Sequence, residues 1–201
     1  MTMSDVIKRY KREAHFESGK HISEQTLNVY FDEDAESPRE WSNISHMVCF
    51  HGRYNLGDNH DYKSGDFSSW DDLEERLIED EGAYIIRPLS LYDHSGITIF
   101  IGEPNDRWDS GRVGFVYVTK ETIEHEYGNI TPEIEKLVEE VIESEVKIYD
   151  QYLQGDVYGY TIEDADGEEI DSCWGFYAID DILGDTGFTE EDGAVEIYSL
   201  Y

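Results

Sequence analysis

The sequence predicts an α+β protein with a mainly antiparallel sheet packed against one or two helices. Strand-like segments outnumber helical ones, and the helices occur singly between groups of strands. Turn-forming residues join successive strand-like segments directly at 93–96 and at 166–167, a spacing typical of β-hairpins. This order favours one layer of sheet covered by a layer of helix.

Short apolar segments define the expected strands. In chain order they fall at 27–31, 46–51, the two halves of 83–101, 112–119, and the two arms of a hairpin at 156–163 and 169–177. Between the second and third strands lies a long loop, residues 52–67, rich in Gly, Asn and Asp. Functional residues concentrate in loops of this kind.

Apolar residues at helical spacing, together with capping residues, define the expected helices. Ser68 or Ser69 caps a helix over about 70–80, and a shorter helix runs from about 119 to 128. A long helix begins after Thr131 and runs to about 153, because Thr is a good N-cap and the Pro that follows it fits the first helical position.

The chain ends differ in charge, and the expected domain organisation follows them. Residues 1–20 hold five basic and three acidic residues, with apolar positions at helical spacing that predict a short basic helix. We therefore expect a basic N-terminal arm at 1–25, an acidic α+β core domain at 26–180 and an acidic C-terminal segment at 181–201. A helical turn is expected at 180–183, and no linker is expected to split the core.

The charge of the chain is its strongest signal. The 201 residues include 47 Asp and Glu against 15 Lys and Arg, so the formal net charge is −32. Residues 121–201 hold 24 acidic and two basic residues, or a net −22. Such a chain repels DNA, RNA and anionic membranes, and its self-repulsion costs stability. A basic protein partner is the use of this charge that we expect.

Several other classes are excluded by what the sequence lacks. No apolar run approaches the ~18 residues of a membrane span, and the N-terminus has no apolar signal-peptide core. Cys49 and Cys173 both lie in apolar segments and are expected to be reduced core thiols, with a long-range disulfide as the alternative. These features indicate a cytoplasmic protein without a membrane partner.

Acidic clusters on the long helix and on the last hairpin are the candidate partner-binding residues. On the helix, carboxylates recur every four residues and form one mutually repelling stripe. The candidates are Glu133, Glu135, Glu139, Glu140, Glu143, Asp164, Asp166, Glu168 and Glu169. A charge of −32 equals that of roughly 54 Å of duplex DNA, whereas a compact domain of this length has a diameter of about 43 Å. The charge density is therefore similar to that of DNA.

A metal-dependent enzyme is the main chemical alternative. Asp58, His60 and Asp61 lie in the long loop, and Asp93 and His94 lie in a turn, so together they offer oxygen and nitrogen ligands. Their spacing matches no recognised metal motif. No phosphate loop or nucleophile motif is present, so no cofactor or catalytic residue is expected and the favoured prediction is a protein that is not an enzyme.

An Asp-rich stretch in the last hairpin has the opening of a calcium-binding loop. It reads Asp164-Ala165-Asp166-Gly167, but its Gly comes too early and the required Glu is missing at the twelfth position. A type I′ turn explains the Asp-Gly pair better.

Four segments of the sequence resemble a family of small acidic proteins from phages and mobile elements of Gram-positive bacteria. They are LSLYDHSGITIF (89–100), WDSGRVGFVYVTKE (108–121), YDQYLQGDVYGY (149–160) and DSCWGFY (171–177). The resemblance spans about residues 45–178 and implies a setting but no catalytic residues. In that setting, acidic DNA mimics block host defence nucleases.

The charge and the resemblance together favour one function. We expect an anti-CRISPR or antirestriction inhibitor that acts as a DNA mimic on a basic nucleic-acid-binding host protein, either a CRISPR effector or a restriction enzyme. It would not bind DNA itself, and it could form a homodimer. The alternatives are an acidic regulatory or interaction protein of phage replication or conjugation, and the metal-dependent enzyme based on Asp58, His60 and Asp61.

Overall fold

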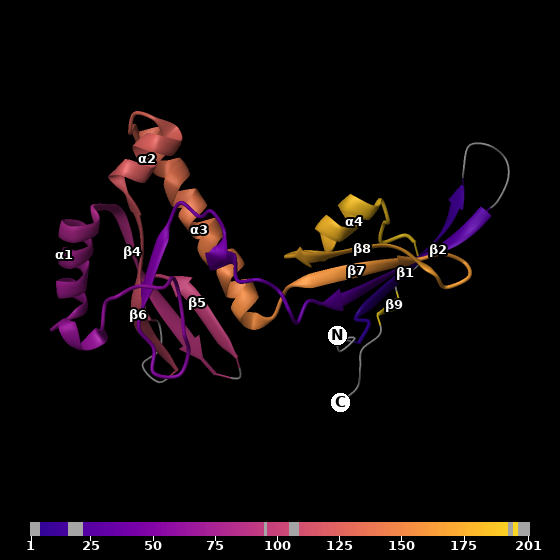
Figure 1. Cartoon of the computed structure of the whole chain (residues 1–201), viewed down its shortest axis with the longest axis horizontal. Helices are drawn as coiled ribbons and strands as arrows, with labels where there is room; N and C mark the ends of the chain where they lie inside the picture. Colours follow the sequence, from indigo (N-terminus) through magenta and orange to yellow (C-terminus); the bar gives the residue numbers. More distant parts are fainter. Residues whose placement is uncertain (1–4, 16–21, 95, 105–108, 193–194, 197–201) are drawn as a thin grey trace. The chain divides into compact units, whose positions relative to one another are not determined.

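The computed structural model describes residues 5–15, 22–94, 96–104, 109–192 and 195–196, which form two compact units (Figure 1). The terminal unit contains 1–36 and 155–201, and the central unit contains 37–154. Both carry an antiparallel sheet packed on helix, so the predicted α+β class is confirmed. The boundaries do not fall at 25/26 and 180/181 as expected, because both ends of the chain enter the same sheet.

The central unit is built on a four-stranded sheet in the order β3-β6-β4-β5, with every neighbouring pair antiparallel. Its strands are β3 (His46–Cys49), β4 (Ala83–Asp93), β5 (Ile97–Ile101) and β6 (Ser110–Thr119). Its helices are η1 (Pro38–Glu40), η2 (Ser64–Asp66), α1 (Trp70–Glu81), α2 (Lys120–Tyr127) and α3 (Pro132–Gln154). All three predicted helices of this region are therefore present.

Helices cover both faces of this sheet, with α1 on one side and α3 on the other (Figure 1). Leu73 and Leu77 of α1 pack against Phe115, and Val138 and Ile142 of α3 pack in the cluster that holds the next strand residue, Val116. Residues 113–118 of β6 are consequently all buried, a pattern expected of a strand covered on both faces.

Caps fix where these helices begin and end. The Ser69 hydroxyl accepts a hydrogen bond from the backbone N–H of Asp72 (3.2 Å) at the start of α1. Gly82 then ends the helix with φ +70°, a conformation that favours glycine. The hydroxyl of Thr131 accepts from the N–H of Ile134 (3.4 Å) at the start of α3. The caps expected from the sequence are confirmed.

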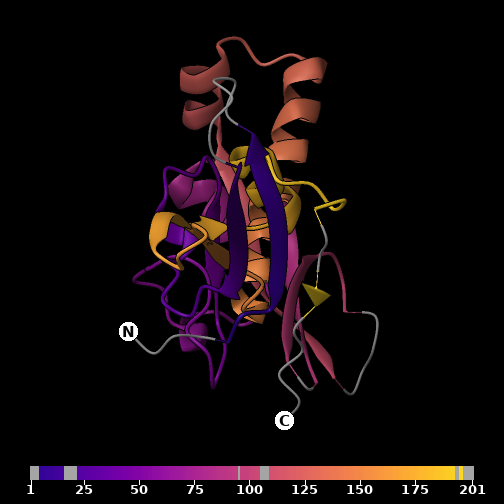
Figure 2. The ribbon, with the colours of Figure 1, turned by 90° about the vertical axis from the view of Figure 1, so that its right-hand side faces the viewer.

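The terminal unit is a five-stranded antiparallel sheet in the order β8-β7-β2-β1-β9. Its elements are β1 (Lys8–His15), β2 (Ile22–Phe31), β7 (Tyr158–Glu163), β8 (Glu169–Phe176), α4 (Ile179–Thr186) and β9 (Val195–Glu196). Figure 2 shows β1 and β2 as the long paired strands of this sheet. Helix α4 covers one face, where Ile182 and Phe188 pack on Tyr10, Leu27 and Tyr160.

The predicted basic helix at the N-terminus is wrong. Residues 8–15 form β1, which pairs antiparallel with β2 over its whole length, and Tyr10 of this strand is fully buried. Lys8 pairs with Glu190 (2.8 Å) and Lys11 with Glu24 (3.0 Å). The basic cluster is therefore bound to its own unit.

The two cysteines do not share one environment. Cys49 is buried as expected, whereas Cys173 is exposed on β8, so the expected burial of both thiols is half wrong. Neither forms a disulfide. In the expected acidic C-terminal segment, residues 195–196 form β9, and residues 197–201 lie outside the described part of the chain.

Candidate functional site

Helix α3 presents the predicted glutamates in two different ways. Glu133, Glu140 and Glu143 are exposed, whereas Glu135 and Glu139 are half-buried. Glu135 accepts a hydrogen bond from the Tyr84 hydroxyl (2.6 Å) of β4. The predicted stripe of equivalent carboxylates is therefore divided, because part of it faces the sheet.

The division is sharpest between two glutamates one helical turn apart. Glu139 forms an ion pair with Arg87 of β4, whereas Glu143 has no hydrogen bond or ion pair among the described residues. Near the start of the helix, a hydrogen bond with Thr131 lowers the pKa of Glu133. A basic partner would therefore meet exposed carboxylates at 133 and 143, whereas Glu139 already has Arg87 as its partner.

These two residues give a matched pair of variants. Glu139→Gln should lower the free energy of unfolding by about 0.5 kcal/mol, because a half-exposed ion pair is lost. Glu143→Gln should leave it nearly unchanged, because repulsion from Glu139 and Glu140 is lost together with a weak attraction to Lys147 one turn on. Thermal unfolding in low salt measures both, and a larger loss in Glu143→Gln would mean that Glu143 is a structural residue.

The hairpin between β7 and β8 places its acidic residues at an exposed tip. The Asp164 carboxylate accepts hydrogen bonds from the N–H groups of Asp166 (2.9 Å) and Glu168 (3.0 Å), so it holds the turn. Asp166, Glu168 and Glu169 are exposed, and Glu169 accepts a bond from the Ser172 hydroxyl (3.0 Å). Three of the four predicted carboxylates of this hairpin are thus open to a partner.

The turn itself differs from the expected two-residue type I′ turn. Backbone bonds join Asp164 N–H to the Glu168 carbonyl and Gly167 N–H to the Asp164 carbonyl, each 3.0 Å long, so the loop has three residues. Gly167 has φ +83°, as in a type I turn followed by a G1 bulge. The hydrogen bonds and the positive φ of this turn account for its Asp and Gly residues, so no calcium site is needed to explain them.

The loop residues of the alternative metal site make contacts with other parts of the protein or are exposed. Asp58 forms a bidentate pair with Arg39, from Nε to Oδ1 at 2.7 Å and from Nη2 to Oδ2 at 3.0 Å. His60 lies 3.1 Å from the Cys49 carbonyl through Nε2, and its ring meets Phe50 edge-on. Asp61 is exposed.

The second half of that site is equally dispersed. Asp93 pairs with Arg53, and His94 lies 3.9 Å from Asp109. In the described parts of the chain, no three His, Cys, Asp or Glu side chains lie close enough together to hold a metal ion. The expected grouping of the loop with the turn is thus not formed there. Burial also raises the pKa of Cys49 to about 12, which opposes a thiolate nucleophile.

A buried charge network in the central unit escaped the sequence analysis. The Arg39 side chain is 4% exposed, and besides Asp58 it bonds the Ser45 carbonyl (2.7 Å) and lies 3.9 Å from Glu145 of α3. Glu145 accepts the backbone N–H groups of Ile44 (2.9 Å) and Ser45 (3.1 Å). The network holds residues 37–58 against α3. This structural role could not be predicted from the sequence, because the partners are far apart along the chain.

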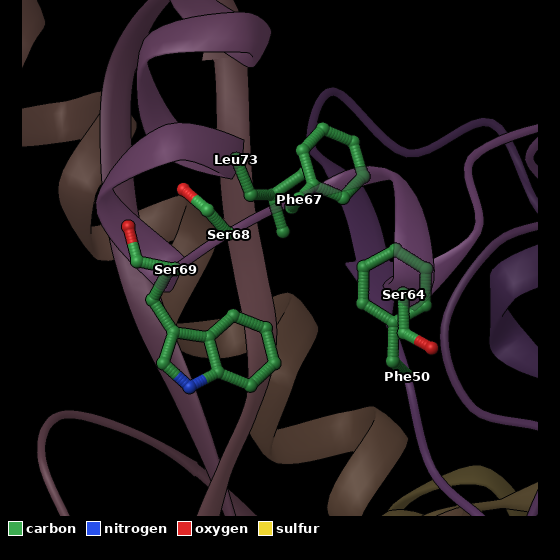
Figure 3. Close-up of a pocket in the computed structure, with 7 residues that line it drawn as sticks. Phe50, Ser64, Phe67, Ser68, Ser69 and Leu73 are labelled. Carbon is green, nitrogen blue, oxygen red and sulfur yellow. The ribbon is translucent and has the colours of Figure 1, made fainter.

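A small pocket in the central unit lies between aromatic rings (Figure 3). It has a volume of about 200 Å³ and is lined by Phe50, Ser64, Phe67, Ser68, Ser69, Trp70 and Leu73. The hydroxyls of Ser68 and Ser69 both bond Asp72 at the start of α1, so they serve the helix end. The pocket can take an apolar side chain, but it contains none of the predicted acidic residues.

Comparison with known proteins adds no identity. No family model, no curated protein and no solved structure matches the chain. Among the described helices, none combines the length and the apolar character that crossing a membrane requires.

Proposed function

We propose that the protein is a non-enzymatic inhibitor that acts in the cytoplasm of a bacterial host. Its acidic surface occupies the nucleic-acid-binding surface of a basic host protein, and a defence nuclease, either a CRISPR effector or a restriction enzyme, is that protein. The observation that carries the proposal is the net charge of −32, in a protein most of whose described Lys and Arg side chains are already paired with its own carboxylates.

The pairing leaves the negative field nearly uncompensated. In the described part of the chain, most Lys and Arg side chains form ion pairs with the protein's own carboxylates. They are Lys8, Lys11, Arg39, Arg53, Arg76, Arg87, Arg112, Lys120 and Lys136. The remaining carboxylates project a field that attracts a basic cleft and steers it over long range, as DNA does.

The setting narrows the class of partner. The resemblance to phage and mobile-element proteins supports a role against host defence, where nucleases with basic clefts are the natural targets. A second copy of the chain is disfavoured as the main partner, since two bodies of −32 repel. The bound basic cluster of β1 also argues against a contact with nucleic acid through that cluster.

Capture followed by competition tests the proposal. The immobilised protein is exposed to a lysate of a Gram-positive bacterium at low salt, and bound proteins are eluted first with duplex DNA and then with salt. We expect a nuclease in the DNA eluate, because mimic and DNA compete for one surface. If duplex DNA elutes no protein and salt alone releases the bound proteins, the result favours the alternative, a partner from replication or conjugation.

Titration of the captured nuclease separates binding from catalysis. Cleavage of plasmid DNA by a fixed amount of enzyme should stop at a fixed molar ratio of inhibitor, because a mimic occupies its target one for one. Inactivation by far less than one equivalent would mean turnover, and therefore an enzyme.

A further inference from the structure

We infer that the outer edge of β8 is a docking site for an extended basic segment of the partner protein, which adds to the sheet as a further strand. The inference rests on the proposed function and names the contact that it uses. It starts from the position of β8 (Glu169–Phe176), which ends the order β8-β7-β2-β1-β9. In the described structure β7 is its only strand neighbour.

The edge of β8 has backbone groups to offer. In an antiparallel pair, alternate residues direct N–H and C=O away from the neighbouring strand, so an edge strand presents a row of them to solvent. On β8 the N–H of Ser172 donates to the carboxylate of its neighbour Asp171 (2.9 Å), a bond within the strand itself. The strand has no Pro and no Lys, two residues with which proteins usually block such edges.

Both faces of β8 are exposed as well as its edge. Every residue from 169 to 175 is exposed, although α4 covers the neighbouring part of the sheet. Ile170 and Trp174 are 51% and 40% exposed, an unusual exposure for large apolar side chains on one strand. The register against β7 shifts between Glu169 and Asp171, so Ile170 lies at a β-bulge near one end of the edge and Trp174 lies near the other end.

Trp174 is held in place for contact. Its ring lies over Gly159 of β7, where a Cβ atom would come within 2.0 Å of it, and its centroid is 5.8 Å from that of Tyr30. Only glycine at 159 allows this position. A fixed, half-exposed indole is a typical anchor of protein interfaces.

Charge decides between the possible occupants. From residue 148 to the end, the sequence has 15 acidic residues and no Lys, Arg or His. Glu168, Glu169 and Asp171 flank or belong to the edge and are exposed. A second copy would bring the same charges together, whereas a strand rich in Lys or Arg would be attracted. The occupant is therefore a basic, extended segment, recognised by backbone bonds, by Ile170 and Trp174, and by the surrounding carboxylates.

Two peptides of equal charge test the docking site on the unmodified protein. One is the octapeptide Lys-Val-Val-Lys-Lys-Val-Val-Lys, and the other has proline in place of each valine, which removes N–H donors from both edges of the peptide. We expect the valine peptide to bind about tenfold more tightly, with chemical-shift changes at the β8 amides. Equal binding of both peptides would overturn the edge contact but leave the charge-driven function standing. Binding of neither at low salt would count against both.

Matched variants test the same contact in the inhibitor. Ile170→Lys and Ile78→Lys each replace a half-exposed isoleucine, 51% and 47% exposed, by a lysine, one on β8 and one on α1 of the central unit. Only Ile170→Lys should weaken the binding of the valine peptide, by about fivefold. An equal effect of both variants would show that the peptide senses net charge alone, and thermal unfolding checks that both variants fold.

Discussion

Arg39→Ala should lower the free energy of unfolding of the central unit by about 3–5 kcal/mol, because it leaves Asp58 and Glu145 without their buried cation. The Asp58 and Glu145 side chains are only 24% and 13% exposed. Hydrogen exchange of the β6 amides in this unit measures the loss. Arg39→Lys should recover part of it, since Lys keeps the charge but not the bidentate geometry.

A surface ion pair serves as the control. Arg76→Ala removes the pair between Arg76 and Asp80 on α1, whose side chains are 56% and 43% exposed. Its expected cost is below about 0.5 kcal/mol. Equal losses in Arg39→Ala and Arg76→Ala would mean that the buried network contributes nothing beyond an ordinary surface pair.

Alkaline pH should destabilise the central unit strongly. Burial raises the pKa of Cys49 from 9.0 to about 12 and that of Tyr149 from 10.0 to about 12, so the folded state keeps protons that the unfolded state releases. The free energy of unfolding is therefore unaffected below pH 9 and falls as the pH rises from 9 to 12. The slope is on the order of 1 kcal/mol per pH unit for each group, beginning near pH 9 for Cys49 and near pH 10 for Tyr149.

Denaturant unfolding at a series of pH values measures this slope, and a variant assigns it. Cys49→Ala should be less stable at pH 7 because it leaves a cavity, yet its stability should fall less steeply between pH 9 and 12. An unchanged slope in Cys49→Ala would remove the thiol from the explanation.

Local signals predicted most elements of the central unit. The caps at Ser69 and Thr131 and the turn near Asp93 depend on adjacent residues, and the structure confirms them. The division into two units could not be predicted in this way. It depends on the pairing of β2 with β7, more than a hundred residues apart, and nothing in either strand specifies its partner.

The candidate site could not be fully predicted for the same reason, because the ion-pair partners of its residues lie far away in the sequence. Helical spacing placed Glu139 and Glu143 on one stripe, but Arg87 of β4 neutralises one of them and not the other. Likewise the loop sequence predicts Asp58 as a metal ligand, whereas in the fold its carboxylate pairs with Arg39. A positive charge distant in sequence decided both cases.

The most direct test of the central claim is the affinity of the protein for the captured nuclease between 50 and 500 mM salt, with and without duplex DNA. If the surface acts as a DNA mimic, affinity falls steeply with salt, since exposed charges are screened within about 8 Å at physiological ionic strength, and DNA competes for the same surface. Affinity that stays flat over this range, or a ternary complex with DNA, would contradict it.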